Sequence, residues 1–135
     1  MKGTKTLRRT ALAGAVSLAC VVGLADPAAA SSANLSGWVK STTTYYKTKR
    51  TITAGGSHIY LRINRVPADM VVFWYKCGDK SVRGRNVHFY PGDDGKRKLI
   101  GSDFRAGTVF CLGDAGDISE SGAAWSGSLN WNVYS

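Results

Sequence analysis

Alternation of apolar and polar side chains near the C-terminus constrains the fold of this chain more than any other feature. In the segment WSGSLNWNV, the residues of one parity are Trp125, Gly127, Leu129, Trp131 and Val133. The other parity holds only serine and asparagine. A β-strand points successive side chains to opposite faces, so this period of two predicts a strand with one apolar face. After residue 30, no apolar repeat of about 3.6 residues is long enough to predict a helix, and we expect an all-β chain.

Further strands are predicted where the same period, or a continuous apolar run, lies between turn residues. These segments are residues 41–53, 58–63, 70–77, 87–90, 98–100 and 107–112. The segment 70–77, MVVFWYKC, is apolar on both faces until Lys76, which predicts a central strand. The segment 41–53 is rich in Thr, Tyr and Lys, which is typical of an edge strand. Residues 31–37 are expected to be mobile, and residues 113–124 to form a polar loop.

The parity of each predicted strand sorts its side chains into an inward and an outward set. The residues predicted to face inward are Ile59, Leu61, Ile63, Val71, Phe73, Tyr75, Cys77, Val87 and Phe89. Trp74 then faces away from Cys77, which requires either a second packed layer or an exposed aromatic contact. Six to seven short strands joined by turns predict a single antiparallel β-sandwich, immunoglobulin-like or jelly-roll in type, over residues 31–135. A small closed barrel is the alternative.

Residues 1–30 have the organisation of a secretory signal peptide. Four bases come first, the apolar run 11–24 follows, and small residues then precede a predicted cleavage site after Ala30. The run is shorter than the roughly 20 residues that cross a bilayer. The alanine-rich composition and the Arg-Arg pair resemble export signals of high-GC Gram-positive bacteria, and alanine where a larger apolar residue usually follows the pair favours the general export route. We therefore expect a secreted protein without a membrane anchor.

Removal of that segment leaves two of the three cysteines, Cys77 and Cys111. An even pair in an exported chain predicts one disulfide, and free or metal-binding thiols are the competing interpretation. A bond across a loop of this length stabilises a domain by about 3 to 4 kcal/mol in the chain-entropy model. It is also expected to stiffen the point where strand 70–77 passes into a basic connection.

Residues that support catalysis or metal binding are scarce after residue 30. That part of the chain has one glutamate, two histidines and no G-x-S-x-G motif. Asp114, Asp117 and Glu120 are spaced three apart but lack the pattern of a calcium loop. His58 and His88 alone do not complete a zinc site. We therefore expect no enzyme, no metal and no cofactor.

The charge of the chain is strongly positive and unevenly distributed. Residues 31–135 contain 14 Lys and Arg against 8 Asp and Glu, a net charge of +6, and every base lies at or before Arg105. Outward-facing aromatic and basic side chains interleave, which suits a polyanion or a sugar. The predicted binding residues are Tyr46, Arg50, Tyr60, Arg62, Lys80, Arg83, Arg85 and Tyr90, with Lys47 and Lys49 beside them. An ordinary exposed sheet face has the same composition, and this is the competing interpretation.

These features favour a small, monomeric, secreted protein that binds rather than catalyses. The expected partner is an anionic polymer of the extracellular space or the cell wall. The alternative is a protein-directed effector, either an antimicrobial protein or a protease inhibitor. Such an inhibitor would present the loop 77–85 or 91–98, with Arg83 or Arg85 directed at a trypsin-like protease.

Export of the full chain by a secreting bacterium is expected to yield a protein that begins at Ser31 and has no free thiol. Intact mass spectrometry with a thiol label, before and after reduction, measures both properties. A product that retains residues 1–30, or that takes up label without reduction, would contradict the prediction.

Overall fold

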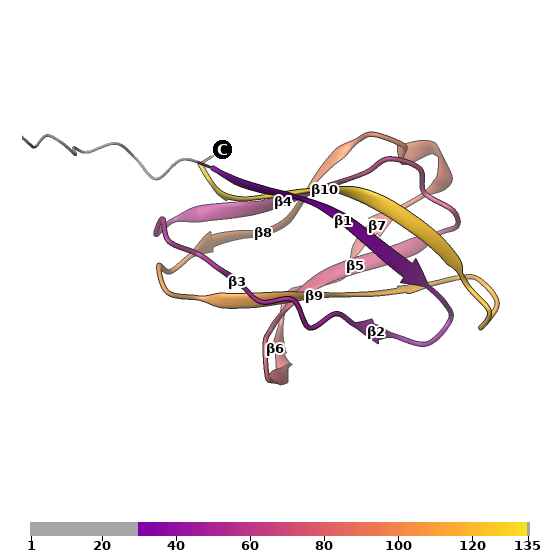
Figure 1. Ribbon diagram of the computed structural model, residues 1–135, viewed down its shortest axis with the longest axis horizontal. Coiled ribbons are helices and arrows are strands. Elements are labelled where there is room, and N and C mark those ends of the chain that lie inside the picture. Colours follow the sequence, from indigo (N-terminus) through magenta and orange to yellow (C-terminus); the bar gives the residue numbers. More distant parts are fainter. Residues whose placement is uncertain (1–29, 135) are drawn as a thin grey trace, which may run out of the picture.

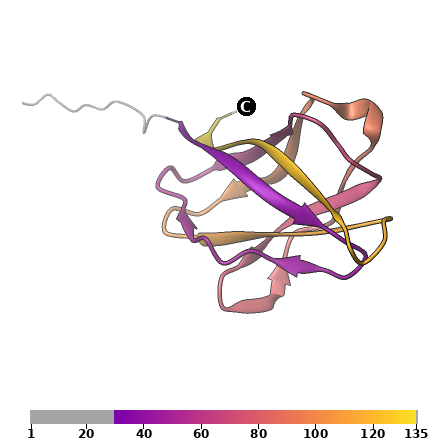
Figure 2. The same ribbon diagram turned by 45° about the vertical axis from the view of Figure 1, so that its right-hand side comes forward.

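Two antiparallel sheets form the structure, a computed structural model that describes residues 30–134. The strand order of the first sheet is β1 (Ser31–Val39), β10 (Ala123–Val133), β4 (Ser57–Ile63) and β8 (Arg97–Phe104). The order of the second sheet is β2 (Thr44–Tyr45), β9 (Val109–Gly116), β5 (Met70–Lys76) and β6 (Asp79–Arg83). In addition, β3 (Arg50–Thr51) pairs with β9, β7 (Val87–Phe89) pairs with β5, and a 3-10 turn, η2 (Pro91–Asp93), precedes β8. The sheets are stacked as two layers (Figures 1 and 2).

The predicted all-β fold with two antiparallel layers is confirmed. Strand pairing stays within two separate sheets, so the alternative of a closed barrel is wrong. Residues 30–134 form ten strands where six to seven are predicted, because β1 and β6 form in segments not predicted as strands and the segment 41–53 forms two short ones. The same residues contain no helix long and apolar enough to cross a membrane. The predicted signal peptide lies outside the described residues, apart from Ala30.

Two segments are more regular than the sequence predicts. Residues 31–37, expected to be mobile, belong to β1, which pairs with β10 over nine consecutive residues. Residues 113–116, expected to start a loop, extend β9, because β5 pairs with all four of them and β2 pairs with residues 113 and 114 on the other side. In contrast, residues 41–53 form only the short strands β2 and β3. Backbone hydrogen bonds to a neighbouring strand decide each outcome, and the local sequence does not encode that neighbour.

The main core lies between the two sheets. The inward-facing prediction for β4 and β7 is confirmed there, since Ile59, Leu61, Ile63 and Phe89 are fully buried. Other strands add further large side chains to this core, among them Met70, Val72, Phe110, Leu112, Trp125 and Leu129. Burial of one such side chain stabilises the fold by about 1.5 to 3 kcal/mol, so this layer is the principal source of stability.

The inward-facing prediction for β5 is wrong. The side chains that point away from the main core are Val71, Phe73, Tyr75 and Cys77. The opposite face of β5, with Val72 and Trp74, points between the sheets, where Trp74 packs edge-on against Phe104 at a centroid distance of 5.0 Å. Phe73 and Tyr75 instead belong to a smaller apolar cluster on the outer face of the second sheet. Because both faces of β5 are apolar, its period cannot distinguish the core from this outer cluster.

A β-bulge near the end of β10 reverses the predicted parity there. The pairing of β10 with β4 shifts register between Asn130 and Val133, and Asn132 has a φ of 59°. Asparagine tolerates this left-handed conformation better than most residues. The side chain of Asn132 is buried, and its oxygen accepts hydrogen bonds from the backbone N–H groups of Thr53 (2.8 Å) and Ala54 (3.3 Å). The prediction that Asn132 faces solvent is therefore wrong.

Asp114, on β9, links the two sheets through a buried hydrogen-bonded cluster. Its Oδ2 accepts hydrogen bonds from the Tyr46 hydroxyl (2.6 Å) and from the Trp125 indole N–H (2.8 Å). Tyr46 follows β2 in the second sheet, whereas Trp125 is on β10 in the first. The other oxygen, Oδ1, is buried without a hydrogen-bond partner among residues 30–134. Burial raises the pKa of Asp114 above its ordinary value of 3.8, and the two hydrogen bonds offset part of this shift.

The Asp114→Asn variant tests the cost of this buried charge. Because the pKa is raised, the folded state holds the proton more tightly than the unfolded chain does. The contribution of Asp114 to the free energy of unfolding is therefore greatest below pH 3.8 and is lost as the pH rises through the raised pKa. The free energy of unfolding of the native chain minus that of Asp114→Asn is expected to fall across this window. Urea denaturation between about pH 3 and pH 8 measures the difference.

Asp117→Asn, a change at an exposed carboxylate three residues away, is the matched control. It is expected to change the free energy of unfolding by less than about 0.5 kcal/mol, because the Asp117 side chain is exposed. A pH-independent difference for Asp114→Asn would show that the carboxyl is not desolvated as the structure indicates.

Candidate anion-binding site

The outer face of the second sheet carries a cluster of three aromatic rings beside the disulfide. We call Tyr45, Phe73, Tyr75 and the Cys77–Cys111 bond the aromatic platform. The Tyr45 ring centroid lies 5.8 Å from that of Phe73 and 5.2 Å from that of Tyr75, both edge-on. Tyr45 comes from β2 and the other two rings from β5, with β9 between these strands in the sheet. The platform therefore depends on strand order and not on neighbouring sequence.

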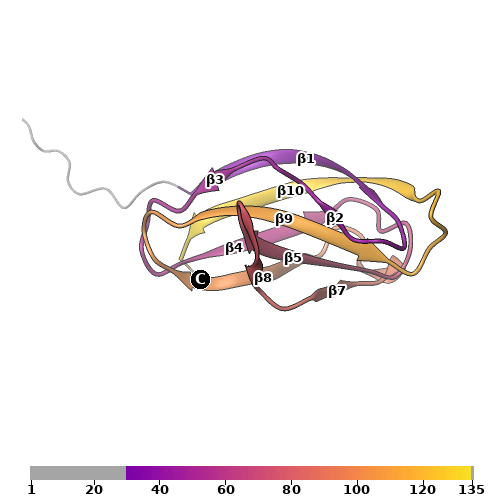
Figure 3. The ribbon, with the colours of Figure 1, turned by 90° about the horizontal axis from the view of Figure 1, so that it is seen from below.

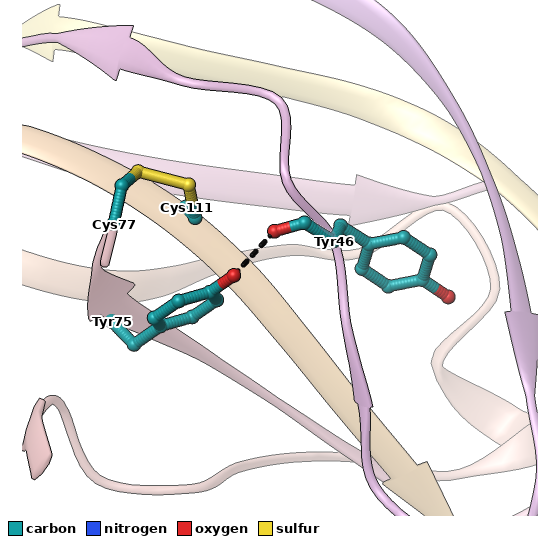
Figure 4. Close-up of a disulfide and its surroundings, with 4 residues drawn as sticks. All are labelled: Tyr46, Tyr75, Cys77 and Cys111. Carbon is teal, nitrogen blue, oxygen red and sulfur yellow. Dashed lines mark hydrogen bonds between the residues drawn. A yellow bond between two sulfur atoms is a disulfide. The ribbon is translucent and has the colours of Figure 1, made fainter. Parts of the chain in front are cut away.

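The predicted disulfide between Cys77 and Cys111 is confirmed, with the two Cα atoms 5.3 Å apart. Cys111 pairs with Tyr75 in the register of β5 and β9, so the disulfide joins the end of β5 to β9, its neighbour in the sheet. The Tyr75 hydroxyl donates a hydrogen bond of 2.6 Å to the backbone carbonyl of Tyr46 (Figure 4). Burial raises the pKa of Tyr75, and the neighbouring Tyr45 adds to the shift. Together these bonds hold β5, β9 and the β2–β3 connection to one another.

Two cations lie over the aromatic platform. Lys80 Nζ is 4.4 Å from the ring centroid of Tyr45, and Arg83 Cζ is 3.6 Å from that of Phe73. Both come from β6, which is exposed along its whole length and projects from the body of the protein (Figures 1 and 2). Arg83 Nε also donates a hydrogen bond of 2.9 Å to the backbone carbonyl of Gly84. An exposed cation–π contact stabilises by about 0.5 to 1 kcal/mol, so β6 is held to the platform partly by its own bases.

A groove of about 490 Å³ lies next to the disulfide. Its lining residues are Lys47, Lys49, Tyr75, Cys77, Gly78, Asp79, Lys80 and Cys111. Lys47 and Lys49 lie two residues apart in the β2–β3 connection, while Lys80 comes from β6. We call this the lysine groove, because it gathers three exposed lysines from two segments that are far apart in the sequence.

The charge of the lysine groove is positive. Asp79 is its one acid, and Asp79 Oδ1 already accepts hydrogen bonds from the Ser81 hydroxyl (2.5 Å) and the Ser81 backbone N–H (3.1 Å). These hydrogen bonds lower the pKa of Asp79, and the charge of Lys76 contributes further, so the carboxylate is ionised at neutral pH. None of the ion pairs found within residues 30–134 involves a lysine of the groove. Three lysines therefore face one aspartate.

Several predicted binding residues lie away from this groove. Tyr60 and Arg62 are on β4, in the first sheet, where the guanidinium carbon of Arg97 lies 3.8 Å from the Tyr60 ring centroid. Arg50, at the start of β3, is half-buried with its guanidinium carbon 5.6 Å from the Trp131 ring centroid, and burial lowers its pKa. The sequence thus groups side chains that the fold separates onto different sheets.

Tyr90 and Arg85 lie on the connections that flank β7. Tyr90 is exposed and stacks on His88, with ring centroids 5.9 Å apart and planes at 9°. Arg85 is exposed between β6 and β7. Neither residue lines the lysine groove.

The predicted exposure of Tyr46 is wrong. Its hydroxyl donates to Asp114 and accepts a hydrogen bond of 2.9 Å from the Trp38 backbone N–H, and its ring packs edge-on against Trp125. Burial raises the pKa of Tyr46, and the hydrogen bond to the Asp114 carboxylate raises it further. Tyr46 is therefore a structural residue, and its neighbour Tyr45 is the tyrosine that faces the platform.

The acidic residues and histidines considered as metal ligands do not converge. Asp114 is buried in the core, whereas Glu120 is exposed and accepts a hydrogen bond of 2.6 Å from the Thr42 hydroxyl. His58 Nδ1 accepts a hydrogen bond of 3.1 Å from the Asp103 backbone N–H. Within the part of the chain that the structure describes, no three His, Cys, Asp or Glu side chains are grouped so as to hold a metal ion.

No protein-family model, curated protein or solved structure matches this chain. What the lysine groove binds therefore has to follow from its own chemistry. That chemistry is three lysines and one aspartate that line a groove together with Tyr75 and the disulfide.

Sequence reasoning misses Tyr45 and Tyr75 as residues of the site. It assigns Tyr75 to the inward face because Phe73, Tyr75 and Cys77 share a parity on an apolar strand. The signal that distinguishes the two faces is the basic segment after Cys77, because Lys80 and Arg83 must lie at the surface and fold back onto these rings.

Removal of the disulfide tests how much of this arrangement depends on it. Cys77→Ala combined with Cys111→Ala is expected to lower the free energy of unfolding by about 3 to 4 kcal/mol, because the bond joins residues 34 positions apart. Guanidinium chloride denaturation measures the loss. Reduction of the native chain is the control that changes no side chain, and it is expected to give a similar loss. A loss below about 1 kcal/mol in both experiments would contradict the structural role of the bond.

Proposed function

We propose that this protein is exported and binds an anionic polymer of the extracellular space or the cell wall, without catalysing a reaction. The lysine groove is the proposed contact surface. The observation that carries the proposal is the convergence of Lys47, Lys49 and Lys80 around one groove in which only Asp79 opposes them. Such a concentration of unpaired positive charge attracts polyanions over several ångströms and accelerates their association.

The backbone beneath the groove is held in place before any ligand arrives. The disulfide fixes the end of β5 to β9, and the hydrogen bond from the Tyr75 hydroxyl to the Tyr46 carbonyl fixes the segment that continues to Lys47 and Lys49. Only the lysine side chains then lose conformational freedom on binding. A preorganised surface of this kind binds more tightly than a flexible loop with the same charges.

The spacing of the lysines favours a polymer over a small anion. Lys47 and Lys49 are two residues apart, which in an extended segment separates their Cα atoms by about 6 to 7 Å. Each ammonium group is a compact point charge and lacks the fork with which arginine grips a single carboxylate. A chain with repeated negative charges can therefore contact all three lysines, whereas one small anion cannot.

Export is part of the proposal because of the predicted signal peptide and the disulfide. Disulfides persist in oxidising compartments outside the cytosol, which agrees with the compartment to which such a signal directs a chain. Anionic polymers are abundant ligands for a basic protein in that location.

The contacts of Arg83 weaken the alternative of a protease inhibitor. An inhibitor of a trypsin-like protease has to present an extended arginine to the protease pocket. Arg83 instead lies over Phe73 and donates hydrogen bonds to Gly84 and Asn86. Arg85 remains exposed but is not part of the groove.

Charge reversal in the groove tests the proposal. Lys47→Glu combined with Lys49→Glu is expected to weaken binding to polyphosphate and to heparin by about tenfold or more at moderate salt. Fluorescence anisotropy of a labelled polymer measures the affinity. The native chain is expected to bind less tightly as salt rises, with a linear plot of log K against log salt. The magnitude of that slope is expected to decrease by about 2 in the variant, because two contacts are lost.

Arg62→Glu combined with Arg97→Glu is the control, since it changes the net charge equally but on the first sheet. This variant is expected to weaken binding by less than about threefold, through the net charge alone. Equal losses from both double variants would mean that the groove is not the binding surface.

A further inference from the structure

β1 forms one margin of the first sheet, and one side of it has no strand partner. It pairs with β10 over nine residues without a shift of register, and no other strand within residues 30–134 pairs with it. Seen face-on in Figure 3, β1 lies outside β10 at the edge of the sheet. The Trp38 N–H donates to the Tyr46 hydroxyl (2.9 Å), and the oxygen of this hydroxyl, whose proton goes to Asp114, lies 3.2 Å from the Trp38 carbonyl oxygen. Both backbone groups of Trp38 therefore point away from β10.

The same side of β1 exposes three more residues whose backbone groups are free. Because these groups alternate in direction along a strand, those of Ser32, Asn34 and Ser36 point the same way as those of Trp38. The pairing of Ser36 with Ser126 on β10 supports this direction. The Ser126 carbonyl points to the other side of β10, where it accepts a hydrogen bond from the Asn64 N–H (2.9 Å), and is therefore not bonded to Ser36. Within residues 30–134, no hydrogen bond satisfies the backbone groups of these three residues. They form a template for another strand.

The other sheet margins carry features that obstruct strand addition. β8 contains Arg97 and Lys98, its pairing with β4 shifts register twice, and Asp103 has a φ of 58°. β6 has five residues and contains Lys80 and Arg83, while β2 and β3 have two residues each. Charges, bulges and short strands are the devices that prevent edge-to-edge pairing. β1 has no charged residue, no proline and no bulge.

In place of the monomer that the sequence favours, we propose that β1 pairs antiparallel with β1 of a second copy of this chain, around a two-fold axis at Asn34. The residues that face solvent are Ser32, Asn34 and Ser36, a sequence that is symmetric about Asn34. The axis places Asn34 opposite Asn34 and Ser32 opposite Ser36, and each of these pairs exchanges both backbone hydrogen bonds. Half-buried Leu35, which packs against the core, then lies opposite the partner's Ala33 and extends the apolar layer.

Charge permits a second copy as the occupant. The chain is basic overall, and Arg50 lies near Leu35 and Ser36, but β1 and β10 contain no charged side chain, so the new strand pair itself brings no like charges opposite each other. The pairing ends before Trp38, whose N–H already donates to the Tyr46 hydroxyl. The dimer carries two lysine grooves, and if the proposed function is right, it binds a long polymer with the avidity of two linked sites. The dimer itself does not depend on that function.

A pair of matched variants tests the dimer by sedimentation velocity over a range of concentrations. The native chain is expected to show a reversible monomer–dimer equilibrium. Asn34→Lys places two ammonium groups opposite each other at the axis and is expected to raise the dissociation constant by about tenfold or more. Asn130→Lys introduces the same side chain on β10, at the residue that pairs with Ser32 within one copy of the chain. It is expected to change the constant by less than about twofold, because it does not touch the new strand pair.

Hydrogen exchange of the native chain gives a second readout that needs no variant. The amides of Ser32, Asn34 and Ser36 are expected to become protected as concentration rises, whereas the exposed amides of β6 are not. A chain that is monomeric up to about 1 mM overturns the proposal, since weaker dimers are not specific. Equal effects of the two variants, or no protection of these amides in a dimer, overturn it as well.

Discussion

A buried carboxylate adds a polar link between the two sheets to the apolar core that they share. Asp114 has no exposed surface, and its two donors come from different sheets, Tyr46 from the segment after β2 and Trp125 from β10. A buried carboxylate is costly unless it is hydrogen-bonded, so the positions of Tyr46 and Trp125 are strongly determined. Gly37 lies opposite Trp125, and any side chain there would overlap the indole. Through Tyr46, this cluster also positions the segment that carries the lysines of the groove.

The second sheet needs cover on both of its faces, and this requirement generates the candidate site. The first sheet covers one face of β5, whereas Phe73 and Tyr75 on the other face point to the outer side of the sheet and are buried by other groups. Tyr45, the disulfide and the cations Lys80 and Arg83 cover these rings without a third layer. Positive charge therefore gathers where aromatic surface has to be shielded from water. The same packing that stabilises the sheet presents bases to a ligand.

The margins of the two sheets differ in charge. β6 and β8 carry bases, and Lys47, Lys49 and Arg50 lie at the β2–β3 margin of the second sheet, whereas β1 is uncharged along its whole length. Basic side chains on an edge strand disfavour its pairing with another strand. The edge of β1 lacks such side chains, so pairing is not opposed there. A polyanion and a second copy of the chain thus have different surfaces available, and the two proposed interactions do not compete for the same residues.

The sequence by itself determined the period of the strands and the buried face of β4, because both follow from the local alternation of apolar and polar residues. It also determined the disulfide, because only two cysteines lie after residue 30 and they can pair in one way only. Only the tertiary structure decided which face of β5 meets the core, because both faces are apolar. It also decided that Asp114 and Asn132 are buried, since their partners lie on strands distant in sequence. The lysine groove belongs to this second group. Its bases follow from composition, but their convergence depends on strand order, and a period of two contains no information about which strands are neighbours.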